Sequence, residues 1–240
     1  MTRPPRKSYF AAYRGRVFRM VEAQHRISTS RLAGSLLDEE RLERLVEEVK
    51  PPMPRAAQGL HHLLATPFRY GHRSASRFRR AGERPGIFYA SESTATCLAE
   101  MAYWRLKFFA AAPAASLPGT TTEHLMFSAR VVGERTLDLT NPPFAADRAR
   151  WTDPNDYSAC QLFADRARKI DTQAIRYESV RDPGNGRNLA LLDPACFERP
   201  MPKAEGTWHF RFRAGHLTAI AAAPSDGRYE FGFDQFGLGR

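Results

Sequence analysis

Residues 87–112, IFYASESTATCLAEMAYWRLKFFAAA, decide the fold of this chain. The first four residues, Ile87–Ala90, are apolar and predict a short buried strand. The strand runs into a helix for which Ser93 or Thr94 is a suitable N-cap. Apolar side chains cover nearly every side of this helix between Thr94 and Ala112, which is typical of a buried helix. The stretch therefore predicts a core strand followed directly by a core helix.

Glu100 is the only acidic residue between Thr94 and Ala112. It shares a helix face with Tyr103 and Trp104, because side chains three and four residues apart are neighbours. A carboxylate in apolar surroundings is costly unless a partner compensates its charge. Two interpretations follow: a functional acid in a pocket, or a surface ion pair with Arg105 or Lys107.

An arginine-rich segment, RYGHRSASRFRRAGER, precedes the strand at residues 69–84. One interpretation is a solvated loop. The other is a clamp for a diphosphate or carboxylate, because the guanidinium group binds these anions with two parallel hydrogen bonds.

The remaining chain predicts an α+β protein, with short strands, a hairpin and few helices. Residues 1–66 are predicted to form an N-terminal extension, and residues 67–240 the main domain. In the extension we expect a strand at Arg16–Met20 and an amphipathic helix at 38–50 that packs on the domain or forms a dimer contact. Asp153 and Pro154 suggest the start of a helix that extends to residue 169. Further strands are expected at Leu125–Val132, Arg135–Leu139, Ala174–Arg181, Asn188–Leu192, Thr207–Arg213, Leu217–Ala222 and Arg228–Asp234.

Composition restricts the classes of function. Three distant cysteines predict no disulfide framework, and no secretory signal or membrane-length apolar run is present, so we expect a cytoplasmic protein without membrane contact. The formal charge of +10 suits phosphates, nucleic acid or an acidic protein. Direct nucleic-acid binding is the weakest of these, since no nucleic-acid motif accompanies the charge. The spacing of histidine, cysteine and acidic residues predicts no metal site.

Four ordered segments resemble the core of RES-domain proteins, over about residues 66–220. They are TPFRYGHRSASRFRRAGERPGIFYASESTATCLAEMAYWR from Thr66, LDLTNPPF from Leu137, DYSACQLFADRAR from Asp156 and IRYESVRDPGNGRNLALLDP from Ile175. The resemblance implies a fold like that of ADP-ribosyltransferases, with a split, mostly antiparallel sheet flanked by helices, and the consumption of NAD+ as substrate without a metal.

The resemblance also implies the site residues. The family arginine corresponds to Arg77, with Arg73 and Arg79 as near alternatives, and it would hold the pyrophosphate. Tyr89 would stack on the nicotinamide or ribose, and Glu100 would stabilise positive charge on the ribose during bond cleavage. The family serine has two matches, Ser179 and Ser158, either of which would donate hydrogen bonds to the substrate.

In function, the resemblance implies a toxin of a type II RES–Xre toxin–antitoxin pair. We expect mono-ADP-ribosyl transfer to a cellular protein; the alternative is an NAD+ phosphorylase or glycohydrolase that depletes NAD+, and a non-catalytic nucleic-acid-binding module is less favoured. The implied partner is an antitoxin with an Xre-like helix-turn-helix region that blocks the active site, in a hetero-oligomer with the toxin.

Overall fold

The computed structural model describes residues 2–23, 35–112, 114 and 116–239. Its strands are β1 (Ala11–Glu22), β2 (Phe88–Ser91), β3 (Thr122–Asp138), β4 (Ala174–Glu178), β5 (Arg187–Leu191), β6 (Lys203–Arg213), β7 (His216–Ala221) and β8 (Arg228–Phe231). Its α-helices are α2 (Leu36–Val49), α3 (His62–Arg69), α4 (Thr94–Ala110), α5 (Arg148–Trp151) and α6 (Ser158–Arg168). Short 3-10 turns complete the described elements: η1 (Lys7–Tyr9), η2 (Arg55–Ala57), η3 (Phe144–Asp147), η4 (Pro194–Cys196) and η5 (Asp234–Phe236).

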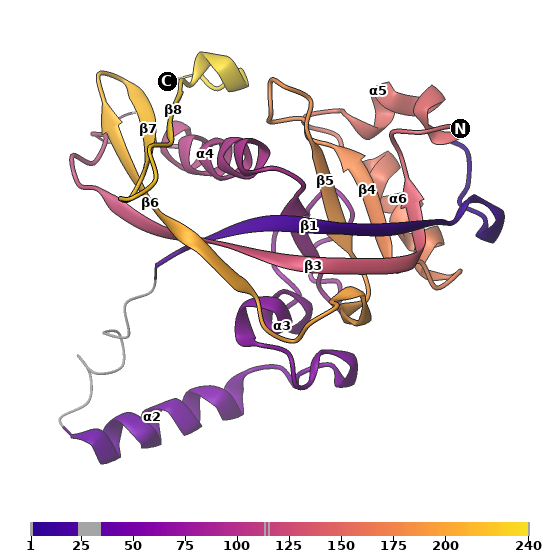
Figure 1. Ribbon diagram of the computed structural model, residues 1–240, viewed down its shortest axis with the longest axis horizontal. Helices are drawn as coiled ribbons and strands as arrows, with labels where there is room; N and C mark the ends of the chain where they lie inside the picture. Colours follow the sequence, from indigo (N-terminus) through magenta and orange to yellow (C-terminus); the bar gives the residue numbers. More distant parts are fainter. Residues whose placement is uncertain (1, 24–34, 113, 115, 240) are drawn as a thin grey trace.

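A long antiparallel ribbon of β1 and β3 runs through the whole molecule (Figure 1). The other edge of β3 pairs with β6 over residues 122–128, and with β4 in parallel over residues 136–138. The sheet therefore divides into two wings, β6–β7–β8 at one end and β4–β5–β2 at the other, and β2 returns to β1 through Phe18 and Ser91. This arrangement confirms the predicted α+β class with a split, mostly antiparallel sheet.

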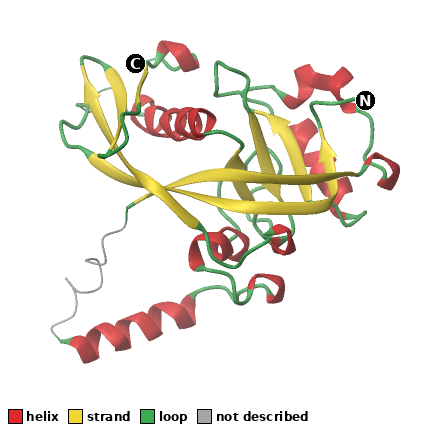
Figure 2. Ribbon diagram, in the orientation of Figure 1, coloured by secondary structure: helices red, strands yellow, loops and turns green. Residues whose placement is uncertain are grey.

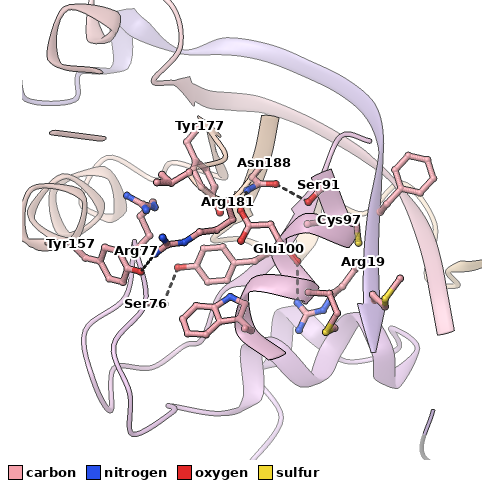
Figure 3. A pocket seen from close by; sticks show the side chains of 17 residues that line it. Arg19, Ser76, Arg77, Ser91, Cys97, Glu100, Tyr157, Tyr177, Arg181 and Asn188 are labelled. Carbon is pink, nitrogen blue, oxygen red and sulfur yellow. Dashed lines mark hydrogen bonds between the residues drawn. The ribbon is translucent and has the colours of Figure 1, made fainter. Parts of the chain in front are cut away.

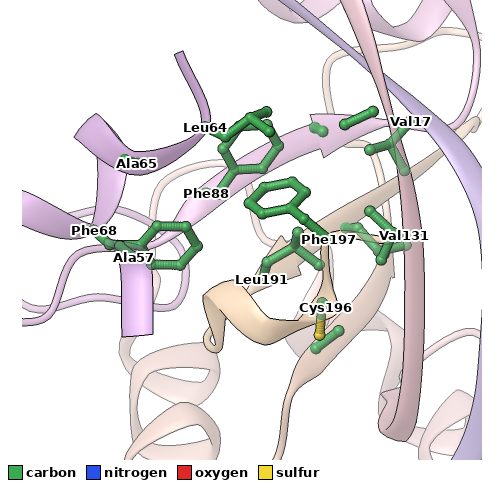
Figure 4. Close-up of a cluster of buried hydrophobic side chains, with 14 of the residues drawn as sticks. Val17, Ala57, Leu64, Ala65, Phe68, Phe88, Val131, Leu191, Cys196 and Phe197 are labelled. Carbon is green, nitrogen blue, oxygen red and sulfur yellow. The ribbon is translucent and has the colours of Figure 1, made fainter. Parts of the chain in front are cut away.

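Helices cover the two wings separately (Figure 2). The α4 residues Leu98 and Leu106 pack in one apolar cluster with Phe210 of β6 and Leu217 of β7. The α6 residue Phe163 lies in a second cluster with residues of β4 and β5. The third cluster lies beneath α3, where Phe68, Phe88 and Phe197 pack together (Figure 4). Each wing has its own apolar core. The region between the two wings can therefore hold polar side chains.

The central stretch folds as its sequence predicts. The Ser93 hydroxyl accepts a hydrogen bond from the Thr96 backbone N–H, so Ser93 is the N-cap of α4. The helix directly follows β2, and Leu98 and Leu106 are completely buried. The hairpin of β4 and β5 is also confirmed, with a left-handed backbone at Asn185 (φ 52°).

Three predictions about elements need correction. The two strands expected at 125–132 and 135–139 form one continuous strand, β3. Asp153 does not cap α6, which begins at Ser158. Its carboxylate accepts hydrogen bonds from the backbone N–H groups of Asn155 and Asp156, as an N-cap would, but the backbone there is not helical and α6 starts later.

The N-terminal segment holds one confirmed element, the strand, and the third correction, which concerns the packing of its helix. The strand expected at Arg16–Met20 exists and is longer, and as β1 it lies inside the sheet between β2 and β3. The helix predicted at 38–50, which was expected to pack on the domain or to form a dimer contact, forms as α2, but its Leu45 and Val49 are 59% and 84% exposed and do not pack on the domain. Its Glu47 forms an ion pair with Arg69 of α3. Thus one part of this segment is integral to the sheet and the other extends from the body.

Among the described helices, none combines the length and apolar character needed to span a membrane. Cys97, Cys160 and Cys196 are buried free thiols.

Candidate active site

A cavity of about 390 Å³ lies where β1, β2, the start of α4 and the loop before α6 meet (Figure 3). Its volume falls within the range of small-molecule pockets. Eleven of its lining residues carry polar side chains or a thiol: Arg19, Ser76, Arg77, Tyr89, Ser91, Cys97, Glu100, Tyr157, Tyr177, Arg181 and Asn188. Trp104 and several apolar residues complete the wall. Of the predicted site residues, the cavity brings together Arg77, Tyr89 and Glu100.

Two hydrogen bonds orient the carboxylate of Glu100. The Ser179 hydroxyl and the Asn188 side-chain amide both donate to Oε1, each at 2.7 Å. No donor among the described residues binds Oε2 at hydrogen-bond distance. Glu100 likewise forms no ion pair with Arg105 or Lys107 among these residues, so the surface-pair interpretation is wrong. The carboxylate is thus fixed through one oxygen and available to a ligand through the other.

Ser179 lies behind Glu100 rather than in the cavity wall. Its oxygen accepts hydrogen bonds from the backbone N–H groups of Arg181 (3.2 Å) and Asp182 (3.1 Å). Because a hydroxyl has one proton, and the oxygen is engaged as an acceptor, that proton is directed to Glu100. Ser179 is therefore a positioning residue for the carboxylate, and it is 1% exposed.

The loop that carries Ser179 is attached to the first turn of α4. Asp182 accepts a hydrogen bond from the Thr96 hydroxyl at 2.7 Å. A Cβ atom on Gly186 would lie 2.0 Å from the Thr96 hydroxyl oxygen, so only glycine permits this close approach. The Asn-Gly turn predicted from sequence therefore also fixes the distance between Ser179 and Glu100.

Asn188 connects three strands beneath the carboxylate. It lies on β5 opposite Ser91 of β2 and Tyr177 of β4. Its side-chain oxygen accepts the Ser91 hydroxyl at 2.7 Å, which leaves the amide nitrogen to donate to Glu100. Asn188 is 2% exposed. A polar residue in the apolar run NLALL was the available sequence signal for this residue.

Arg77 reaches the cavity from the arginine-rich segment. Its guanidinium donates to the backbone oxygens of Trp151 (2.7 Å) and Asp153 (3.1 Å) and lies over the Tyr157 ring. It is 8% exposed and has no carboxylate partner among the described residues. Its positive charge is therefore held in place by neutral groups and is not neutralised. This segment is not a simple solvated loop.

Tyr89 fastens the same segment to β2. Its hydroxyl lies 2.9 Å from the Ser76 hydroxyl and accepts the Phe78 backbone N–H at 3.1 Å. Burial raises the pKa of Tyr89 above its ordinary value. The phenol thus stays neutral, and its ring forms part of the cavity wall.

The remaining predicted residues lie outside the cavity. Arg73 is exposed. Ser158 is exposed too, and its hydroxyl donates to Asp156 at 2.9 Å, while its neighbour Tyr157 lines the cavity. Arg79 is buried but donates to the backbone oxygens of His72 and Ser74, where it stabilises the loop.

Sequence reasoning missed two arginines of the cavity. Arg19 of β1 donates to the Tyr89 carbonyl at 3.2 Å and lies over the Phe88 ring, and burial lowers its pKa to about 10. Arg181 stacks 3.6 Å from the centre of the Tyr103 ring and donates to the Pro154 carbonyl. An arginine within the apolar strand RVFRM was the available signal for Arg19.

The electrostatic balance of the cavity favours an anion. Three guanidinium groups, those of Arg19, Arg77 and Arg181, face a single lining carboxylate, Glu100. Guanidinium groups bind phosphate and carboxylate oxygens strongly when they are partly desolvated. Within the described residues, no group of three or more histidine, cysteine or acidic side chains is placed to hold a metal ion.

The chain is similar to a chain in the crystal structure of the M. tuberculosis MbcT–MbcA toxin–antitoxin complex, with 13% identity and a TM-score of 0.48 over 83% of this chain and 86% of that one. A comparison with curated proteins gives no match. The sequence model of the RES domain matches residues 52–213, which begin after β1 and α2. Since this match covers well over half of the chain, the protein belongs to the RES domain family.

Proposed function

We propose that this protein cleaves the bond between nicotinamide and ribose in NAD+. The observation that carries the proposal is the carboxylate of Glu100, which is held through Oε1 and lines a cavity together with three guanidinium groups and, among the described residues, no second carboxylate. A dinucleotide has the matching features, a pyrophosphate for the arginines and a ribose for the carboxylate. Family membership supports the same substrate, because RES-domain proteins are expected to act on NAD+.

Cleavage of this bond requires stabilisation of positive charge. As the C1′–N1 bond breaks, its electron pair passes to the nicotinamide nitrogen, and the ribose acquires oxocarbenium character. In our proposal Oε2 of Glu100 binds a ribose hydroxyl and stabilises the cation electrostatically. Such stabilisation is strongest where the charged group is already oriented and water is excluded. The hydrogen bonds from Ser179 and Asn188 supply that orientation.

Arg77, Arg19 and Arg181 would bind the pyrophosphate in this proposal. Each is already anchored by a backbone carbonyl, so little side-chain entropy is lost when the anion binds. Tyr89 would shield the reacting ribose from water with its ring.

We propose a cellular protein as the acceptor of ADP-ribose, which makes the enzyme a mono-ADP-ribosyltransferase. The formal charge of +10 and the additional N-terminal segment are suited to docking a macromolecule. Phosphorolysis or hydrolysis of NAD+ is the second candidate. The excess of guanidinium groups over carboxylates in the cavity favours phosphorolysis, because such an excess can bind an anionic acceptor beside the pyrophosphate.

In the cell, we propose that the protein is the toxin of a RES–Xre pair, as membership of the family implies. An antitoxin with an Xre-like helix-turn-helix region would bind it and block the cavity. If a helix-turn-helix gene lies beside the gene for this protein, its co-expression should restore growth and suppress NAD+ loss.

The test is nicotinamide release from NAD+ by the purified chain. Glu100→Gln should abolish release, whereas Glu230→Gln, at an exposed carboxylate on β8, should not change it. Unchanged release by Glu100→Gln would exclude the proposed mechanism. NAD+ labelled in the adenylate, incubated with lysate, then distinguishes the acceptors: label on one protein band supports transfer, and label in small molecules alone supports depletion.

A further inference from the structure

Trp104 is an exposed aromatic residue in the wall of the cavity. It lines the cavity together with Glu100, although half of its surface (50%) remains accessible. The two residues lie four positions apart on α4, so they share a face about one helical turn apart. Leaving a large aromatic side chain half exposed forgoes much of the free energy that its burial would contribute. Such a position is favourable when a ligand completes the burial.

The orientation of the indole ring is restrained by its neighbours. Tyr103 packs against it edge to face, with ring centres 5.2 Å apart. The ammonium group of Lys107 lies 5.2 Å from the ring centre and covers one face through a cation–π contact. The opposite face of the Trp104 indole ring, which is already oriented by these contacts, is therefore the one on which a ligand ring can stack.

The other aromatic rings of the cavity already have partners. Tyr89 is held by hydrogen bonds of its hydroxyl to the arginine-rich segment. Tyr157 is covered by the Arg77 guanidinium, and Tyr177 is buried against Phe78. Phe18 is 9% exposed and is covered by the Arg16 guanidinium. Trp104 thus offers the most accessible ring surface among the aromatic residues that line the cavity.

We propose that Trp104 is the stacking platform for the nicotinamide ring and determines the specificity for a pyridinium leaving group. This inference rests on the proposed cleavage of NAD+. If Glu100 binds the ribose of the breaking bond, a residue one turn away flanks the nicotinamide, whereas the adenine is separated from this ribose by the pyrophosphate and a second ribose. The half-exposed position also suits a leaving group, because nicotinamide must reach solvent after cleavage.

The chemistry of the ring predicts how Trp104 contributes. The pyridinium of NAD+ is a cation, and tryptophan attracts cations more strongly than other aromatic side chains. When the C1′–N1 bond breaks, nicotinamide becomes neutral and most of this attraction is lost. Trp104 therefore stabilises bound NAD+ more than the transition state, and its removal should affect KM rather than kcat.

The first experiment is steady-state kinetics of nicotinamide release by the full chain. Trp104→Ala should raise KM for NAD+ about tenfold, as expected for the loss of one stacking contact, with kcat unchanged or slightly higher. Trp104→Phe should restore most of the affinity. Phe108→Ala is the matched control: this residue is one turn further along α4, is 73% exposed and does not line the cavity, so KM should not change. An unchanged KM in Trp104→Ala overturns the inference.

A binding experiment separates this inference from the proposed function, since it needs no turnover. Nicotinamide mononucleotide, which carries the pyridinium, should quench tryptophan fluorescence of the wild type and not of Trp104→Phe, in which Trp151 and Trp208 remain buried. AMP should quench weakly. Equal quenching by AMP, or equal quenching in Trp104→Phe, contradicts the inference. Failure of the wild type to release nicotinamide, with the quenching intact, contradicts the proposed function instead.

Discussion

The Ser179 hydroxyl donates a 2.7 Å hydrogen bond to Oε1 of Glu100, although these residues come from the β4–β5 loop and the middle of α4. The same oxygen of Ser179 accepts two backbone N–H groups of its own loop. Carboxylate and loop are consequently coupled, because a change in either one alters the position of the other.

Ser179→Ala should reduce NAD+ cleavage by about tenfold to hundredfold. The expected loss corresponds to one hydrogen bond to a charged group. Stability should also fall by about 1–3 kcal/mol, since buried backbone donors lose their acceptor. Ser158→Ala is the matched control, because that hydroxyl is exposed and bound to Asp156. Equal activity of both variants would show that Ser179 does not position Glu100; the measurements are nicotinamide release and urea unfolding.

Asn188→Asp should change the pH dependence of cleavage. It places a second carboxyl within hydrogen-bond distance of Glu100, and two such groups cannot both ionise readily. Below the upper pKa of the pair, one shared proton preserves a single negative charge and activity remains. Above it, the pair is doubly charged and activity should decline, which adds an alkaline limb to the pH–rate profile. Asn188→Ala should lower activity at every pH without this limb; identical profiles for the two variants would refute the expectation.

Arg19→Met should abolish NAD+ binding without lowering the stability of the protein. Burial lowers the pKa of Arg19 to about 10, which indicates that this position disfavours its charged form. A neutral side chain of similar length relieves this cost, so the melting temperature should equal or exceed that of the wild type. Calorimetry should detect no NAD+ binding. Arg14→Met, at an exposed position on the same strand, should bind normally; a drop in melting temperature for Arg19→Met alone would argue for a structural role.

Protonation of His124 should lower the free energy of unfolding at acidic pH. Burial is the main cause of its lowered pKa, and Arg105 adds to the effect. Above the ordinary histidine pKa of about 6.5, the ring is neutral in both states and the full stability is present. As the pH falls from about 6.5 toward the lower pKa of the folded state, stability is lost, because the unfolded chain binds the proton first. His124→Phe should flatten the decline in melting temperature between pH 7.5 and 5, whereas His216→Phe, at an exposed position, should leave the slope as in the wild type.

The strand β1 and the helix α2 of the N-terminal segment should differ in how much they contribute to folding. Removing β1 should abolish soluble expression, because this strand pairs with β3 along nearly its whole length and contributes Val17 and Phe18 to the core. Replacing α2 with a short flexible linker should be tolerated, since Leu45 and Val49 are exposed. A soluble, folded fragment that starts at residue 52, where the RES match begins, would contradict this expectation.

Local sequence signals predicted the elements with strong periodicity or caps. The strand at Ile87–Ala90, the helix capped by Ser93 and the Asn-Gly hairpin all formed where expected, because their determinants lie within a few residues of each other. The Asp153–Pro154 signal predicted only the local hydrogen bonds: the Asp153 carboxylate accepts the backbone N–H groups of Asn155 and Asp156, as an N-cap would, but the backbone does not continue as a helix and α6 begins at Ser158.

Sequence by itself determined the α+β class, the family and the candidate acid Glu100 in its apolar helix. Tertiary structure alone decided which arginines and which serine stand beside that acid. Arg19, Arg181 and Asn188 reach the cavity from separate strands and loops, and no local pattern encodes such distances. Arg73 and Ser158 carry the same chemistry as Arg77 and Ser179, yet their backbones direct them to solvent. The sequence therefore indicated which residue types such a site requires. Long-range strand pairing determined which individual arginines and serines lie beside Glu100.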